Sequence, residues 1–182
     1  MQKLNLVIFS GSNKLITDNI LINNLKKIAN NISLNTFNVG YGGGDSGIMG
    51  VIPKHFEQRG GDVFAVDAIQ FAKYGSKNFG KVTMCETFTE RQNKLVDRGD
   101  IYLCLPGGVG TVSELFDTLV NNDVNKANKK IVLYSYNNFF DPIVDFIKKN
   151  IESGYIRPHV MDHLSIFNNH DDIITYLNNI NK

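Results

Sequence analysis

A glycine-rich stretch in the middle of the chain combines residue types that bind phosphate with a carboxylate. The stretch "LPGGVGTVSELF" (105–116) follows the apolar run "IYLC" and precedes an apolar-periodic run. This pattern predicts a strand, a tight glycine turn and the start of a helix. Backbone N–H groups at a helix N-terminus favour an anion, and glycine lets the backbone approach it closely. The residues predicted to bind phosphate here are Gly107, Gly108, Val109, Gly110 and Thr111.

Glu114 allows two interpretations. Thr111 and Glu114 match the T-x-x-E capping box, in which the glutamate reaches back to the backbone N–H of the threonine. A carboxylate in the first helical turn beside a phosphate site could instead hold a ribose hydroxyl or stabilise a sugar cation. The spacing alone favours the capping role.

Two further glycine loops follow predicted strands. They are "FSGSN" (9–13) and "YGGGDSGIMG" (41–50), and each precedes a predicted helix. All three loops can therefore lie at one edge of a sheet, where they would converge on a phosphate. The candidate binding residues in these two loops are Gly11, Ser12, Gly43, Gly44 and Gly47.

Other nucleotide motifs fit less well. Gly42, Gly44 and Gly47 match G-x-G-x-x-G, and Asp67 lies twenty residues after Gly47, as in a dinucleotide fingerprint. These glycines follow the second predicted strand, however, whereas the fingerprint follows the first. The stretch at 105–116 lacks the G-K-[ST] ending of a P-loop, which disfavours ATP hydrolysis.

Short apolar runs alternate with helical patterns along all 182 residues. This alternation predicts an α/β fold, a doubly wound and mostly parallel sheet of about seven strands with helices on both faces. We expect a single Rossmann-like, nucleotide-binding domain over residues 1–182, with a candidate lid at 68–80. The expected strands are 4–9, 33–39, 62–66, 81–85, 101–105, 130–135 and 164–168.

Composition and charge exclude several classes. The net charge is +1, so neither nucleic acid nor a membrane surface is an expected partner. Cys85 and Cys104 lie in apolar runs, and their spacing matches no zinc site. His159 and His163 are four apart but lie in a predicted loop, so no metal is expected. Without an apolar run of membrane-spanning length, we expect a cytoplasmic protein.

Arg91 lies in "TFTERQ" (87–92), at the start of a predicted helix. On the sequence alone, an exposed helix arginine is the favoured interpretation. The segments "GYGGGDSGIMG", "TFTERQ" and "LPGGVGTVSELFD", however, resemble the LONELY GUY family in order and spacing. The family's P-G-G-x-G-T-x-x-E motif is intact from Pro106 to Glu114. Ser10, Gly11 and Ser12 match its first-strand turn, with serine in place of cysteine.

The resemblance implies a function. The family comprises cytokinin-activating nucleoside 5'-monophosphate phosphoribohydrolases, often mislabelled lysine decarboxylases. It implies hydrolysis of AMP or N6-substituted AMP to free base and ribose 5-phosphate, with Arg91 and Glu114 as catalytic residues. It also implies a homodimer with the site near the subunit interface, and no cofactor. The motifs present no lysine placed to form the Schiff base that a decarboxylase would need.

The sequence departs from the family pattern at two places. Gln92, which we expect among the substrate-binding residues, stands where the family has a lysine after the arginine, and this removes one positive charge from the expected substrate site. The segment 68–80 offers Lys73 and Tyr74 where family members carry an acidic residue. These differences leave open an alternative, a non-catalytic carrier of nucleotide or molybdenum cofactor from the same superfamily.

Overall fold

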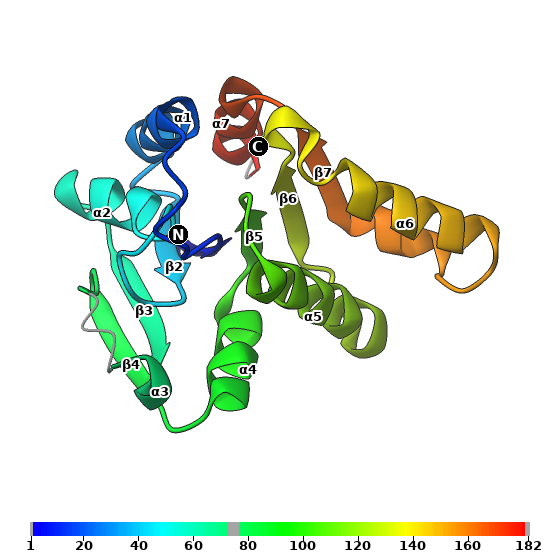
Figure 1. Cartoon of the computed structure of the whole chain (residues 1–182), viewed down its shortest axis with the longest axis horizontal. Coiled ribbons are helices and arrows are strands. Elements are labelled where there is room, and N and C mark those ends of the chain that lie inside the picture. The colour runs from blue at the N-terminus through cyan, green and yellow to red at the C-terminus, as the bar shows by residue number, and fades with distance from the viewer. Residues whose placement is uncertain (1, 73–76, 181–182) are drawn as a thin grey trace.

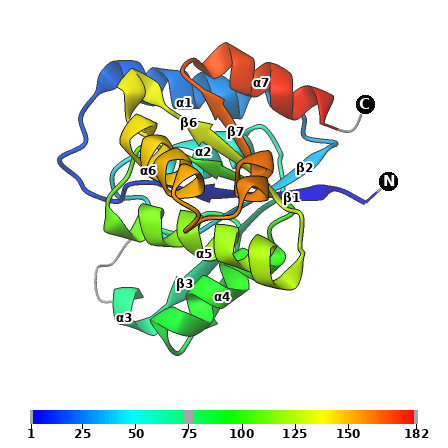
Figure 2. The same cartoon turned by 90° about the vertical axis from the view of Figure 1, so that its right-hand side faces the viewer.

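The protein is built on one seven-stranded sheet. The computed structural model describes residues 2–72 and 77–180. All strands are parallel, in the order β4-β3-β2-β1-β5-β6-β7, and helices cover both faces (Figures 1 and 2). The predicted α/β class is therefore confirmed. The strands are β1 (Leu4–Phe9), β2 (Phe37–Tyr41), β3 (Val63–Ala68), β4 (Lys81–Cys85), β5 (Ile101–Cys104), β6 (Lys130–Tyr134) and β7 (Leu164–Phe167).

Two layers of helices flank the sheet. The layer of α1, α2 and α7 packs on one face, and that of α4, α5 and α6 packs on the other (Figure 1). None of the helices in the described part of the chain has both the length and the apolar character needed to cross a bilayer. The main helices are α1 (Asn19–Asn31), α2 (Val51–Gln58), α4 (Phe88–Arg98), α5 (Val109–Asn125), α6 (Asp141–Glu152) and α7 (His170–Asn179). The shorter ones are α3 (Ile69–Ala72) and 3₁₀ segments at Tyr136–Asn138 and Pro158–His163.

The core lies on both faces of the central strands. In β1, Leu6 and Ile8 belong to the apolar cluster beneath α1, whereas Val7 and Phe9 belong to the cluster beneath α4 and α5. This alternation follows from the two-residue period of a strand. A parallel sheet covered on both faces needs apolar residues at every position, which explains the continuous apolar runs in the sequence. Cys104 is fully buried in the second cluster.

The observed elements differ from the expected ones mainly around the glycine loop at 41–50. The second strand begins at Phe37 and runs to Tyr41, later than the expected range 33–39. The following helix begins at Val51, because the glycine loop occupies residues up to Gly50. In the candidate lid, α3 takes up the first residues after β3. Lys73 and Tyr74 lie outside the described residues.

The sheet changes direction between β1 and β5. From β1 the chain continues outward to β2, whereas from β5 it continues to β6 on the other side. The loops that follow these two strands remain in contact, since the Gly11 N–H donates to the Pro106 carbonyl oxygen at 3.1 Å. Ligands of doubly wound sheets bind in the crevice at such a switch point. Numbered in chain order, the first, second and third glycine loops are those at 9–13, 41–50 and 105–116. The topology therefore places the first and third of these loops at the expected position for a binding site.

Candidate functional site

A cavity of about 640 Å³ opens at the carboxyl ends of the central strands. The loops after β1, β2 and β5 line it, together with the end of β3 and side chains from α4 and α5. Most of the residues singled out from the sequence face this cavity. They are Gly11, Ser12, Gly43, Gly44, Arg91, Gly108, Val109, Gly110, Thr111 and Glu114.

Three of the expected binding residues do not line the cavity. Gly47 has a φ of +61°, and a Cβ there would lie 2.7 Å from the Gly11 carbonyl oxygen, so it lets the first two glycine loops pack together. Gly107 packs against the side chain of Thr111. Gln92 turns away from the cavity toward Asp117 on α5. These positions shape or support the site without facing its interior.

The N-terminus of α5 is open to the cavity. Its N-cap is Gly108, which makes no side-chain capping bond, so the first backbone N–H groups of the helix are available to a ligand. Thr111 is then the third residue of the helix and Glu114 the sixth. The capping box predicted for this pair is therefore wrong. The N-cap, Gly108, lies three residues before Thr111, and Glu114 is too far along α5 to cap the helix.

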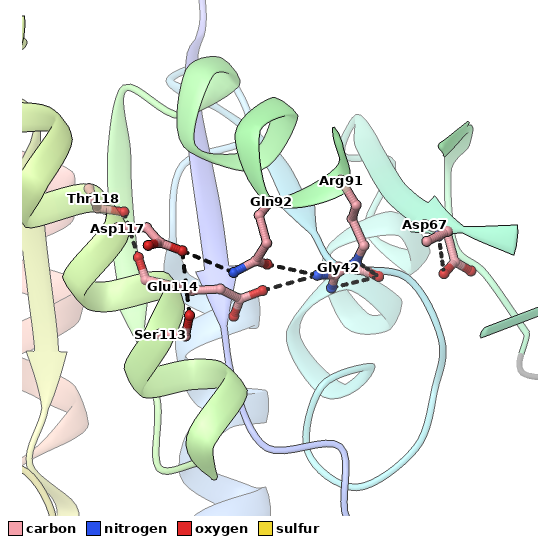
Figure 3. Close-up of polar contacts among 9 residues, drawn as sticks. Gly42, Asp67, Arg91, Gln92, Ser113, Glu114, Asp117 and Thr118 are labelled. Carbon is pink, nitrogen blue, oxygen red and sulfur yellow. Dashed lines mark hydrogen bonds and ion pairs between the residues drawn. The ribbon is translucent and has the colours of Figure 1, made fainter. Parts of the chain in front are cut away.

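Glu114 instead pairs with Arg91. The Arg91 Nη1 lies 3.3 Å from the Glu114 Oε1, and only 7% and 8% of the two residues is exposed (Figure 3). The Nε and Nη2 atoms of Arg91 donate to the Gly42 carbonyl oxygen at 3.1 and 3.0 Å. A Cβ at position 42 would lie 1.8 Å from Nη2, so the guanidinium needs glycine there. The interpretation of Arg91 as an exposed helix residue is wrong.

Aromatic rings hold the other side of the guanidinium. Its Cζ lies 5.7 Å from the ring centroid of Phe71 and 5.9 Å from that of Phe88. The two rings meet edge to face at 6.2 Å, and both line the cavity. Rings at this distance attract a cation through their negative faces. Arg91 is thus fixed by polar contacts and by aromatic packing at the cavity wall.

Burial dominates the electrostatics of Glu114. Loss of solvent raises the pKa of its carboxyl from 4.5 to about 7, while the positive charge of Arg91 opposes this rise and the charge of Asp117 adds to it. The carboxyl group therefore exists in both protonation states near neutral pH. Such a group can carry negative charge against a cation or exchange a proton with a reactant.

Asp67 lines the cavity, and Asn78 connects it to the glycine loop after β2. The Asp67 Oδ1 accepts from the Ala68 N–H at 2.8 Å, and its Oδ2 accepts from the Asn78 Nδ2 at 3.1 Å. The Asn78 Oδ1 in turn accepts from the Gly44 N–H at 2.6 Å, which ties the second glycine loop to the end of β3. The sequence pointed to Asp67, because its distance from Gly47 matches that of the acidic residue in a dinucleotide fingerprint. No motif pointed to Asn78, because it meets Gly44 only through the fold.

Ser10 and Lys14 also line the cavity; Ser10 belongs to the first-strand turn that matches the family, whereas no motif pointed to Lys14. The Ser10 Oγ is buried and has no hydrogen-bond partner among the described residues. Lys14 is exposed in the loop after β1 and brings a positive charge to the cavity. Within the described ranges, no cluster of three or more His, Cys, Asp or Glu side chains could hold a metal ion.

A family model described as "Possible lysine decarboxylase" matches residues 47–177, which is more than two thirds of the chain. The chain belongs to this family. Its match covers the end of the glycine loop at 41–50, Arg91 and the whole of α5. The description of the family carries no activity over to this chain.

Curated relatives confirm the resemblance to the LONELY GUY family. A rice protein named probable cytokinin riboside 5'-monophosphate phosphoribohydrolase is 27% identical over 150 residues, or 81% of this chain and 59% of the relative. An Arabidopsis thaliana protein named for the same activity is 25% identical over 72% of this chain and 58% of its own length. The chain thus matches less than two thirds of these plant relatives. A Mycobacterium tuberculosis protein with this name is 27% identical over 74% of the chain and 73% of its own length.

Solved structures share the fold at lower identity. The molybdenum cofactor carrier protein of Chlamydomonas reinhardtii has a TM-score of 0.70 and 16% identity, covering 97% of this chain and 96% of the carrier. The molybdenum cofactor binding protein of Rippkaea orientalis has a TM-score of 0.69 and 17% identity, covering 100% of this chain and 99% of that one. At this identity the likeness establishes the fold alone.

Proposed function

We propose that the protein is a nucleoside 5'-monophosphate phosphoribohydrolase, which releases the base from AMP or an N6-substituted AMP. One observation carries the proposal. The buried Arg91–Glu114 pair faces the same cavity as the open N-terminus of α5. A nucleotide placed with its phosphate at α5 would bring its ribose to this pair. The names of the curated relatives support the same reaction.

The 5'-phosphate would bind at the start of α5. The backbone N–H groups of residues 108–111 and the positive end of the helix dipole favour an anion there. Gly11 and Ser12 approach from the loop after β1, and Gly43 and Gly44 from the loop after β2. Lys14 would add a positive charge to the same cavity.

Glu114 and Arg91 would act on the sugar and the base. The C1'–N bond breaks with its electron pair moving to the base nitrogen, which leaves a ribosyl oxocarbenium ion. The ionised Glu114 carboxylate would oppose that positive charge and orient the water whose oxygen adds to C1'. The water gives up a proton, and the departing base nitrogen takes one up. Arg91 would donate a hydrogen bond to the base or the phosphate.

A decarboxylase that uses a Schiff base fits the cavity poorly. Such lysines are activated by desolvation or by a neighbouring cation. Lys14, the lysine that lines the cavity within residues 2–72 and 77–180, is exposed to solvent. The family description therefore does not change the proposal.

The decisive experiment measures products. Purified protein is incubated with AMP and with an N6-substituted AMP, and free base and ribose 5-phosphate are separated by chromatography. We expect the wild-type chain to release both products and Glu114→Gln to lose at least about a hundredfold in rate, as for removal of a group that stabilises transition-state charge. Glu152→Gln, an exposed site at the end of α6, is the matched control. Unchanged base release by Glu114→Gln would refute the catalytic role of Glu114.

A carrier without turnover is the second candidate. The folds of the molybdenum cofactor carriers match nearly the whole chain, and a carrier would use the same glycine loops. Binding of nucleoside monophosphates or of molybdenum cofactor by the wild-type chain, without release of base from any nucleotide tested, would favour this candidate.

A further inference from the structure

The side chain of Gln92 lies between two charged groups. Its Oε1 accepts from the Arg91 Nη1 at 3.1 Å, and its Nε2 donates to the Asp117 Oδ2 at 3.2 Å (Figure 3). Gln92 is 6% exposed, and its contact with Arg91 is buried, whereas Asp117 lies at the exposed end of the chain of contacts. They connect α4 to α5 directly behind the Arg91–Glu114 pair.

The orientation of this amide follows from its neighbours. Guanidinium nitrogens only donate, so the oxygen of Gln92 must face Arg91. An ionised carboxylate only accepts, so the NH₂ group must face Asp117. The Asp117 Oδ2 is also within 3.5 Å of the Ser113 Oγ, one turn earlier on α5. Turning the amide around would lose both hydrogen bonds of Gln92.

Gln92 accepts one of the hydrogen bonds that hold the Arg91 guanidinium in place. A guanidinium has five N–H donors. In the described structure, four of them reach Gly42 (twice), Gln92 and Glu114, which leaves one donor on Nη2. Nη1 is the nitrogen shared by Gln92 and Glu114, so the position of Gln92 sets the direction in which Nη1 meets the carboxylate.

We infer that Gln92 is a positioning residue, which holds Arg91 against Glu114 through a hydrogen-bonded chain to Asp117 and does not contact the substrate. The inference rests on the proposed function for its kinetic consequence, but its structural content is independent of that function. It replaces the expectation that Gln92 binds the substrate.

The neutral side chain of Gln92 also matters for the charge of Glu114. Three ionisable groups interact electrostatically with this carboxyl. They are Arg91 from α4, Asp117 from α5 and the buried thiol of Cys104 from β5. A lysine at position 92 would place a second cation beside Arg91. That cation would favour the ionised carboxylate and lower the pKa of Glu114. Glutamine links α4 to α5 without this effect.

The first test compares kinetics of Gln92→Met, which has similar length but no hydrogen bonds, with those of Asn93→Met. Asn93 is the neighbouring, exposed amide of α4, so the same chemical change there is the matched control. We expect Gln92→Met to lower kcat for base release by about tenfold or more, with KM changed less than threefold, because a misplaced catalytic group lowers the rate of the chemical step. A raised KM with unchanged kcat would instead make Gln92 a substrate-binding residue.

The second test does not require turnover. The Glu114 carboxyl is titrated by NMR in ¹³C-glutamate-labelled protein, and Glu114→Gln assigns its signal. We expect Gln92→Lys to lower the apparent pKa of Glu114 by at least one unit, whereas Asn93→Lys shifts it by less than half that amount. An unchanged or raised pKa in Gln92→Lys would overturn the inference. If Gln92→Met fails to fold, Gln92→Lys, which keeps a donor for Asp117, carries the test alone.

The two proposals fail in different ways. A wild-type chain that releases no base refutes the proposed function, while the titration still tests the link from Gln92 to Glu114. Base release by the wild type, with folded Gln92→Met equal to it in kcat and KM, refutes the positioning role and leaves the function intact.

Discussion

The carboxyl group of Glu114 lies in a buried environment that disfavours its ionised form. At 8% exposure it lies next to Arg91 on one side and Asp117 along the helix, and burial outweighs the attraction of the cation. Sites that hold a carboxyl near its titration point are suited to catalysis at neutral pH. The same feature makes the stability of the protein depend on pH.

We predict that Glu114 makes the folded state less stable as pH rises. Its pKa is raised from 4.5 to about 7 on folding, so the folded chain binds more protons than the unfolded chain between these values. The stabilisation is full below about pH 4.5 and is lost as pH approaches 7. Urea unfolding at pH 5 and pH 8 should therefore show a smaller fall in the free energy of unfolding for Glu114→Gln than for wild type. An equal fall in both proteins would contradict the raised pKa.

At the scale of the elements, α4 carries the residues that meet α5. The chain contains the T-x-x-E pattern at 87–90 as well as at 111–114. The first of these caps a helix. The Thr87 Oγ1 accepts from the Glu90 N–H at 3.1 Å, and the Glu90 Oε2 accepts from the Glu86 N–H at 2.9 Å. This cap begins α4 one turn before Arg91, so it defines the end of the helix that presents the guanidinium.

Removing this cap should cost stability. Thr87→Val keeps the shape of the side chain but loses the oxygen that accepts from Glu90, and we expect a loss of about 1 kcal/mol in the free energy of unfolding. Thr89→Val, an exposed position in the first turn of the same helix, is the control. Urea titration of the three proteins measures the difference. Equal stabilities of the two variants would show that Thr87 does not support α4.

At the scale of the whole molecule, the sheet order assembles the cavity. The first, second and third glycine loops follow β1, β2 and β5, which lie side by side in the sheet. Parallel strands bring their carboxyl ends to the same edge, so loops about a hundred residues apart in the chain line one cavity. The outer surface of α5, in contrast, exposes Val120 and Val124 by 58% and 68%.

We propose, from the family resemblance, that the chain forms a homodimer, and that this surface of α5 takes part. The two valines lie one turn apart on α5, beside the groove between α4 and α5. Light scattering should give about twice the chain mass of 20.4 kDa for wild type, and close to the mass of one chain for the double variant Val120→Lys/Val124→Lys. Tyr155→Lys, at an 85% exposed site after α6, should leave the mass unchanged. A monomeric wild type would contradict the proposal.

The sequence by itself determined the α/β class, the approximate elements and the edge of the sheet at which to look for a site. These features depend on local patterns, namely apolar periodicity and glycine turns, which a single sequence displays. It also led to Glu114 and Arg91, through a motif that the resemblance identified.

Only the tertiary structure decided how these residues meet. Arg91 contacts a carbonyl 49 positions away and a carboxylate 23 positions away, and neither separation has a local signature. Gln92 likewise meets its partner only in the fold. The family pattern placed it at the substrate, whereas in the structure its side chain contacts Asp117. The T-x-x-E spacing could not tell which of its two copies caps a helix, because the answer depends on where each helix begins. Packing between distant elements fixes the partners of a buried side chain, and those partners decide its charge and its role.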